Sequence, residues 1–186
     1  MLFGKRTLRP GESVLVVGIG GGVAVACLQL ARMIGARVFV TSSSDEKIER
    51  ARALGAEAGV NYRKDPVSKA ILDMTDGAGV DMVIDSVGEA SWGESLRSLR
   101  RGGRLITCGA TTGSNPPSEI QRLFIRQLEI YGSTGGSLSE FRELLDVFIR
   151  GLLTPVVDST FAMRDIRAAF DRLAAGAQFG KISLVA

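Results

Sequence analysis

The sequence predicts an α/β fold in which a doubly wound, parallel, six-stranded sheet carries helices on both faces. Between Gly11 and Tyr131, short β-branched runs alternate six times with longer segments of helical period, and glycine stands at the junctions. Such alternation implies right-handed crossovers and a parallel sheet, for which we expect the strand order 3-2-1-4-5-6. The chain has 186 residues, of which 45% are hydrophobic, enough for a domain with a sizeable core.

The strands of this sheet are short runs that read as buried, beginning with SVLVV. They are expected at residues 13–17, 38–41, 60–62, 82–85, 104–108 and 129–132. Helices are expected between them, over a segment with an apolar face that ends at Gly35, and over residues 43–54, 66–74, 90–99 and 118–126. Ser43, with Glu46 three positions later, predicts a capping box at the second helix.

The pattern changes after Leu138. One amphipathic helix continues to Arg150, and Gly151 and Pro155 then interrupt the chain. A strand at 156–161, a helix at 163–175 and a strand at 181–185 follow without extending the alternation. We therefore divide the chain into a main α/β domain, residues 1–154, and a short C-terminal extension, residues 155–186.

Composition excludes several classes of function. The chain has no histidine, which removes imidazole bases and histidine-ligated zinc. Cys27 and Cys108 are too far apart in sequence for a paired-cysteine metal site, so we expect no metal and two buried thiols in a reducing, cytoplasmic compartment. A net charge of +3 does not indicate a nucleic-acid partner. The longest uncharged run, residues 14–28, is shorter than the roughly 20 residues of a membrane span, and the polar N-terminus predicts no signal peptide.

The stretch GIGGGVA, from Gly18 to Ala24, lies between the first strand and the first helix. Residues without side chains allow backbone N–H groups to approach an anion, and the start of a helix adds a partial positive charge. Gly18, Gly21 and Ala24 follow each other at three-residue intervals, although Val23 occupies the third glycine of the common GxGxxG register. The context favours dinucleotide binding over a glycine-rich turn that merely packs.

The end of the second strand indicates which dinucleotide is bound. Hydroxyl side chains at residues 41–44, including Ser42 and Ser43, are followed by Lys47. Hydroxyls and a cation suit the 2′-phosphate of NADP, whereas NAD sites usually carry an acidic residue here. Asp45 argues for NAD, but it can instead complement the dipole of the helix. We therefore predict NADP rather than NAD.

Three loops follow strands that end at the same edge of the sheet, where an open parallel sheet binds its ligands. They are residues 86–89, beginning with Ser86, and residues 109–113 and 133–137. We expect these loops to line the nicotinamide half of the site. The arginines at positions 97, 100, 101 and 104 are expected to form a solvated surface.

Other chemistries fit the sequence less well. A short-chain dehydrogenase needs Tyr and Lys four positions apart, but Gly135 and Pro66 stand four residues after the two tyrosines. Gly180 and Lys181 are followed by Ile182, so they do not complete a phosphate loop. A methyltransferase of the same architecture usually carries an acidic residue in its first strand, and residues 14–17 contain none.

The ordered motifs SVLVVGIGGGVAVACLQLARMIGARV, SSSDEKIERARALGA, GVDMVIDSVG, GGRLITCGATTG, YGSTGGS and FGKISLV resemble the cofactor-binding half of a medium-chain dehydrogenase/reductase, nearest to the quinone oxidoreductase and zinc-type alcohol dehydrogenase branch. The resemblance implies a Rossmann-type fold. By position it also implies three sets of contacts: pyrophosphate at Gly20, Gly21, Gly22 and Val23; 2′-phosphate at Ser42, Lys47 and Tyr62; and nicotinamide at Val87, Gly109, Ala110 and Ser133.

The same resemblance implies a reaction class and partners. The family transfers hydride between a nicotinamide and an activated C=C or C=O group of a small molecule such as a quinone, enone or aldehyde. Its members have a preceding catalytic domain, which the C-terminal extension would complete, and they often form dimers through the sixth strand. The alternative is a nucleotide-binding module without turnover of its own. No catalytic acid or base can be assigned from these residues.

Overall fold

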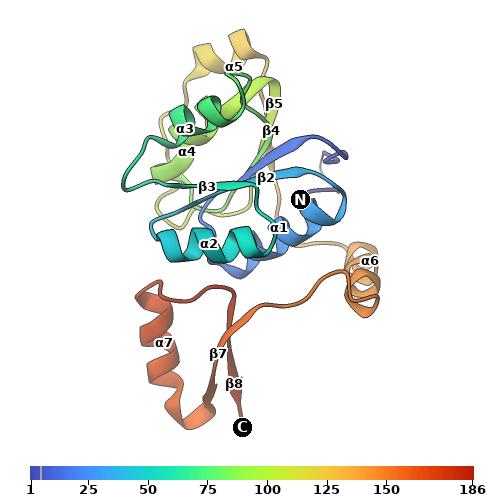
Figure 1. The fold of residues 1–186 in the computed structure, drawn as a ribbon, viewed down its shortest axis with the longest axis vertical. Helices are drawn as coiled ribbons and strands as arrows, with labels where there is room; N and C mark the ends of the chain where they lie inside the picture. Colours follow the sequence, from blue (N-terminus) through green and yellow to red (C-terminus); the bar gives the residue numbers. More distant parts are fainter. Residues whose placement is uncertain (5) are drawn as a thin grey trace.

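The computed structural model, which describes residues 1–4 and 6–186, contains a six-stranded parallel sheet and a separate two-stranded sheet (Figure 1). The large sheet has the order β3-β2-β1-β4-β5-β6, which confirms the predicted topology. Its strands are β1 (Ser13–Val16), β2 (Arg37–Ser42), β3 (Ala58–Asn61), β4 (Val80–Asp85), β5 (Leu99–Thr107) and β6 (Glu129–Gly132). The helices that connect them are α1 (Gly22–Met33), α2 (Asp45–Ala53), α3 (Val67–Met74), α4 (Glu89–Ser98) and α5 (Ile120–Arg126).

Alternate side chains of β1 enter two different cores, because successive residues of a strand point to opposite faces. Val14 and Val16 belong to one apolar cluster, together with buried side chains of α1 and Ala51 of α2. Leu15 belongs to the other, together with buried residues of α3 and α4. The sheet is therefore covered on both faces, and most side chains of its central strands β1 and β4 are apolar and buried.

Local boundaries differ from the prediction where the sequence offers several similar residues. The side chain of Ser44, and not of Ser43, caps α2 by accepting a hydrogen bond from the backbone N–H of Lys47. The expected capping box at Ser43 was therefore wrong: the N-cap lies one residue later in a run of three serines, and Lys47, not Glu46, stands at the third position of the helix. Strand β5 begins five residues earlier than expected, at Leu99, and its pairing with β4 is interrupted by a register shift.

The C-terminal part consists of α6 (Leu138–Ile149), β7 (Val157–Ala162), the 3₁₀ turn η1 (Met163–Asp165), α7 (Ile166–Ala174) and β8 (Lys181–Val185). Strands β7 and β8 pair with each other in parallel. Together with α7 they project beyond α1 and α2 in Figure 1. Many apolar side chains here are exposed, among them Phe141 and Phe148 of α6 and Phe170 of α7.

Among the contacts that hold this C-terminal unit against the larger domain, two involve Arg50 of α2. Asp158, whose side chain is 1% exposed, pairs with Arg172 of α7 at 2.6 Å and with Arg50 of α2 at 3.6 Å. The guanidinium of Arg50 also lies 4.5 Å from the ring centre of the buried Phe179. The returning chain therefore rests on α2, beside the carboxyl edge of the large sheet.

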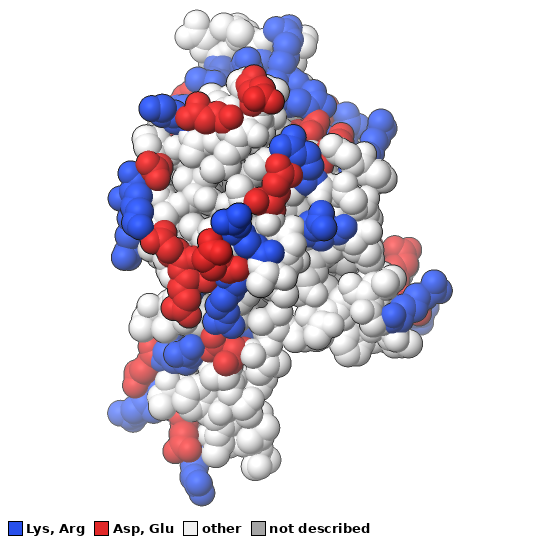
Figure 2. All heavy atoms as spheres, in the orientation of Figure 1, with Lys and Arg blue, Asp and Glu red and all other residues white. Residues whose placement is uncertain are grey.

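Acidic and basic side chains are interspersed over the visible face of the molecule (Figure 2). Within the described residues, no helix combines the length and apolar character needed to cross a membrane.

Candidate functional site

The loop between β1 and α1 has a backbone that glycine makes possible. Gly18 and Gly20 have φ angles of 73° and 138°, a region that other residues rarely adopt. The N–H of Gly18 donates to Oγ1 of Thr41 at 3.0 Å, and the N–H of Ile19 donates to the carbonyl of Thr41 at 2.7 Å. The loop is thus held against the end of β2.

The turn from this loop into α1 leaves room for an anion. A side-chain carbon at Gly21, the N-cap of α1, would meet no atom within 4 Å. No side chain caps this helix, and its first turn contains no acidic residue. The first N–H groups of the helix therefore have no side-chain cap, and the helix dipole gives this end a partial positive charge. Gly20, Gly21, Gly22 and Val23 lie together here, and the loop fits a diphosphate by space and by charge.

Lys181, which sequence reasoning did not select, lies over the same loop. A side-chain carbon at Gly22 would lie 2.5 Å from Cε and 3.1 Å from Nζ of Lys181. The N–H of Gly180 donates to the carbonyl of Gly20 at 2.8 Å and so fixes β8 beside the loop. The only signal in the sequence was the motif FGKISLV, and nothing in it shows a contact across about 160 residues. The structure thus places the ammonium of Lys181 beside the glycine loop.

The polar residues after β2 lie beside this loop. Ser42 is buried, and its Oγ accepts a hydrogen bond from the N–H of Ser44 at 3.2 Å; Ser43 is half-buried. The ammonium of Lys47 donates to the carbonyl of Gly176 in the C-terminal unit. It also lies close to Gly20, since a side-chain carbon placed on that glycine would be 3.2 Å from the ammonium. Burial lowers the pKa of Lys47 below its usual value. A cation therefore stands between the glycine loop and the end of β2.

Asp45, the residue that argued for NAD, is engaged elsewhere. Its carboxylate accepts a hydrogen bond from Asn61 at 2.7 Å and pairs with Lys64 at 2.5 Å. These two partners, Lys64 first, lower the pKa of Asp45. The carboxylate is thus bound to the last residue of β3 and to the chain that follows it, although it remains exposed.

A cavity of about 380 Å³ opens beside the glycine loop, at the carboxyl ends of β1, β2 and β4. Three of the predicted site residues, Gly18, Tyr62 and Val87, line it together with Thr41. The structure thus brings Tyr62 and Val87 to the same cavity, although the resemblance implies that they contact different ends of the dinucleotide. Tyr62 is 53% exposed, so its ring borders the mouth of the cavity.

A second cavity, of about 470 Å³, lies at the end of β5. Gly109 and Ala110 line it, together with Gly88 of the preceding loop. Gly109 must be small, because a side-chain carbon there would lie 2.9 Å from the carbonyl oxygen of Ser86. Ser133 lines neither cavity; its N–H donates to the carbonyl of Thr107 at 2.9 Å. Of the predicted residues, Gly18, Tyr62, Val87, Gly109 and Ala110 therefore line the two cavities, whereas Ser42, Ser43, Ser86 and Ser133 line neither.

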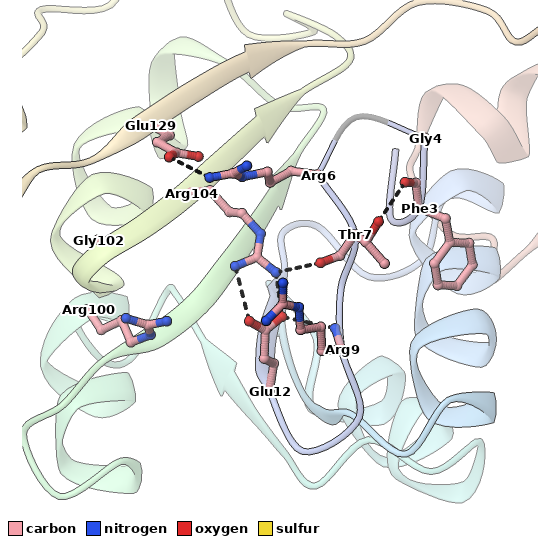
Figure 3. Close-up of a pocket in the computed structure, with 10 residues that line it drawn as sticks. All are labelled: Phe3, Gly4, Arg6, Thr7, Arg9, Glu12, Arg100, Gly102, Arg104 and Glu129. Atoms are coloured by element: carbon pink, nitrogen blue, oxygen red, sulfur yellow. Dashed lines mark hydrogen bonds and ion pairs between the residues drawn. The ribbon is translucent and has the colours of Figure 1, made fainter.

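The opposite edge of the sheet carries a hollow of about 470 Å³ lined by Arg6, Arg9, Arg100 and Arg104 (Figure 3). Three of these arginines are already paired with carboxylates, Arg6 with Glu129, Arg104 with Glu12 and Arg100 with Asp81. The prediction that the arginine cluster is a solvated surface was wrong for Arg104, whose side chain is only 7% exposed. Arg104 instead joins β5 to Glu12 and to the carbonyl of Thr7. Three of the arginines that line the hollow thus form ion pairs, and the ion pairs of Arg6 and Arg104 hold the N-terminal segment against the sheet.

The two cysteines are free thiols. Burial raises the pKa of Cys27 to about 12, and burial followed by the nearby Asp85 also raises the pKa of Cys108. Neither is activated as a nucleophile near neutral pH. Within the part of the chain that the structure describes, no group of three or more Cys, Asp or Glu side chains could hold a metal ion.

Comparison with known proteins matches residues 22–150 to the zinc-binding dehydrogenase family. The chain belongs to this family. The match confirms the resemblance to the cofactor-binding part of medium-chain dehydrogenases/reductases. The family name refers to zinc, but a chain without histidine and without a cluster of acidic or thiol ligands among its described residues does not fit a zinc site, and we derive no step through zinc.

Relatives and solved structures agree on an oxidoreductase family. The chain is 37% identical to a zinc-type alcohol dehydrogenase-like protein of Schizosaccharomyces pombe, over 98% of this chain and 55% of that protein. It superimposes with a TM-score of 0.90 on an NAD-dependent alcohol dehydrogenase, at 36% identity over 96% of this chain and 52% of the other. It also matches a quinone oxidoreductase of Pseudomonas syringae pv. tomato, with a TM-score of 0.87 and 29% identity over 100% of this chain and 60% of the other. The chain therefore spans about half the length of the proteins it matches.

Proposed function

We propose that this chain binds NADP(H) and forms the nucleotide-binding part of an oxidoreductase acting on an activated C=C or C=O group, such as a quinone, enone or aldehyde. The observation that carries this proposal is the glycine loop at the start of α1. Its backbone is turned at Gly18 and Gly20, and the space above Gly21 is open. Family membership agrees with dinucleotide binding, since the matched family consists of dehydrogenases.

The residues around the loop would hold the dinucleotide at two places. The first N–H groups of α1 and the ammonium of Lys181 would neutralise the diphosphate. Gly18, Thr41, Tyr62 and Val87 border a cavity next to that loop, which would take part of the nucleoside. The bound cofactor itself supplies the hydride chemistry. The chain's contribution is to bind and orient it.

Lys47 supports the preference for NADP over NAD. Its ammonium lies beside Gly20 and Ser42 stands at the end of β2, where dinucleotide sites recognise the 2′ position. The ammonium of Lys47 would donate hydrogen bonds both to the carbonyl of Gly176 and to a bound 2′-phosphate. One similar structure, by contrast, is named as an NAD-dependent alcohol dehydrogenase.

Calorimetric titration with NADPH and NADH tests the proposal. We expect micromolar binding of NADPH and weaker binding of NADH. Affinity for neither nucleotide, in a chain that circular dichroism shows to be folded, would refute the proposal. Stronger binding of NADH would refute the choice of NADP.

The second candidate function is a nucleotide-binding module without turnover. The length comparison favours it for this chain taken alone, because the chain spans only about half of the matched proteins and the family resemblance implies a separate catalytic domain. Assays of quinone, enone and aldehyde reduction with this chain and NADPH separate the two candidates. Binding without turnover would support the module, and turnover would support the enzyme.

A further inference from the structure

Asp85 is a fully buried carboxylate at the carboxyl end of β4, at the edge of the sheet that carries the glycine loop. Its Oδ1 accepts hydrogen bonds from the backbone N–H groups of Val87 at 2.8 Å and Gly88 at 3.0 Å. Its Oδ2 accepts from the hydroxyls of Ser91 and Ser95, both at 2.7 Å. A buried carboxylate is unfavourable unless it is hydrogen-bonded or paired, and these four donors satisfy it.

Each oxygen of Asp85 holds a different part of the cavity wall. Oδ1 fixes the turn of the loop between β4 and α4, in which Gly88 has a φ of 88°. Oδ2 fixes the first two turns of α4, because Ser91 and Ser95 lie one turn apart on the same helix face. Val87, Ser91 and Ser95 all line the cavity of about 380 Å³.

The loop held by Asp85 makes contacts on both sides. A side-chain carbon at Gly18 would lie 3.1 Å from Cγ2 of Val87, so the loop abuts the glycine loop. On the other side, the N–H of Thr112 donates to the carbonyl of Val87 at 2.9 Å, and the N–H of Glu89 donates to the carbonyl of Gly113 at 3.1 Å. These bonds join the loops after β4 and β5, which line the two cavities. A shift at Asp85 would therefore move the wall of both.

We propose that Asp85 is a positioning residue for dinucleotide binding: its two oxygens lock the loop after β4 and the start of α4 into the wall of the cofactor cavity. Asp85 itself does not touch the ligand. The inference rests on the proposed function. It assigns the residue that sets the geometry of the site.

Helix α4 offers a matched set of variants. Ser91 and Ser95 donate to Asp85, whereas the buried Ser98 donates to the backbone carbonyl of Glu94 at 2.8 Å. We expect the double variant Ser91→Ala/Ser95→Ala to raise the Kd for NADPH and for NADH at least fivefold, and Ser98→Ala to change it less than twofold. Asp85→Ala should raise both values at least tenfold. Asp85→Asn, which keeps an acceptor for the two backbone N–H groups, should recover most of the affinity.

Thermal unfolding of each variant separates loss of positioning from loss of stability. Unchanged nucleotide binding in Asp85→Ala and in the double serine variant would overturn the inference. An Asp85→Asn variant as weak as Asp85→Ala would also overturn it. If Asp85→Ala does not fold, the comparison between the double serine variant and Ser98→Ala still decides.

A readout without nucleotide keeps this inference separate from the proposed function. Amide hydrogen exchange at Val87 and Gly88 should be slow in the native chain and at least tenfold faster in Asp85→Ala, or in the double serine variant where Asp85→Ala does not fold. Equal exchange rates would overturn the positioning role even if the nucleotide binds. A native chain that binds no nucleotide, with slow exchange at these amides, would refute the proposed function and leave the loop geometry established.

Discussion

Under the proposed function, Lys47 is the side chain that would decide between NADP and NAD. It stands at the start of α2, beside the glycine loop, and its ammonium has a single hydrogen-bond acceptor among the described residues, the carbonyl of Gly176. Burial has already lowered its pKa, so the ammonium is incompletely solvated. The carboxylate of Asp158 acts on this ammonium but also pairs with Arg50 and Arg172, so a 2′-phosphate would add a counter-charge to a site where cations predominate.

Changing Lys47 to Glu should therefore weaken NADPH far more than NADH. We expect a loss of at least thirtyfold for NADPH, about 2 kcal/mol, because a carboxylate would repel the phosphate, and less than threefold for NADH. Calorimetric Kd values for both nucleotides measure the difference. Arg52→Glu is the control, since Arg52 is an exposed residue of the same helix that pairs with Glu49. Equal losses for the two nucleotides would contradict the assignment of Lys47.

At the scale of elements, the turn from β1 into α1 depends on one open position. Gly21 has a φ of −80°, which any residue adopts, and a side chain there would point into empty space. Gly18 and Gly20 differ, because their positive φ angles strain any other residue. Substitution at Gly21 therefore tests the anion space without disturbing the fold.

We expect Gly21→Val to abolish binding of both nucleotides, with at least a hundredfold rise in Kd, because the branched side chain fills the space above the start of α1. The unfolding midpoint should change by only a few degrees. Titration and thermal unfolding of the same sample measure both effects. Retained affinity would show that the glycine loop does not hold the diphosphate.

The sequence predicted the elements better than the contacts between them. Alternation of strands and helices is a local pattern, and it was sufficient for the order of all six strands and for the exact bounds of β6. Burial of Arg104 depends on Glu12, 92 positions away, and no local pattern reveals such a pairing. The same holds for Lys181 over Gly22. Asp85 was missed because an acidic residue at the end of a strand gives no sign of the donors that surround it.

At the scale of the whole molecule, β6 is an edge strand whose outer side has no partner among the described residues. Ile130 on this strand is 39% exposed, and no charged residue follows it before Ser133. An uncovered edge of this kind is prone to pairing with another strand. We propose that two copies of the chain pair edge to edge along β6.

Light scattering coupled to size-exclusion chromatography, over a range of protein concentrations, tests this pairing. We expect a dimer in the native chain and a monomer in Ile130→Lys, because a charge at the edge disfavours strand addition. Lys69→Glu, an exposed change on α3, is the control for altered charge and should remain a dimer. A monomer at the highest concentration of the native chain would exclude the proposal.

The attachment of the C-terminal unit should make stability depend on pH through Asp158. The hydrogen bond from Arg172 holds the pKa of Asp158 well below the usual value of about 3.9, so this carboxylate stabilises the folded chain above about pH 4 and the contribution is lost as the pH falls further. We expect Asp158→Asn to lower the free energy of unfolding by about 2 kcal/mol at pH 7. Below pH 4, the difference in free energy of unfolding between the native chain and the variant should narrow by at most about 1.4 kcal/mol per pH unit.

Urea unfolding of both proteins at pH 7, 5, 4 and 3 measures this gap. Asp165→Asn is the matched control, because Asp165 is 56% exposed and lies 3.8 Å from Arg164. Its effect should stay below about 0.5 kcal/mol at every pH, as for other exposed pairs. The difference in free energy of unfolding between the native chain and Asp158→Asn could instead be the same at pH 7 and pH 3. That result would show that the carboxylate does not stabilise the docked unit, because the expected narrowing comes from proton uptake by Asp158 in the unfolded chain over this range.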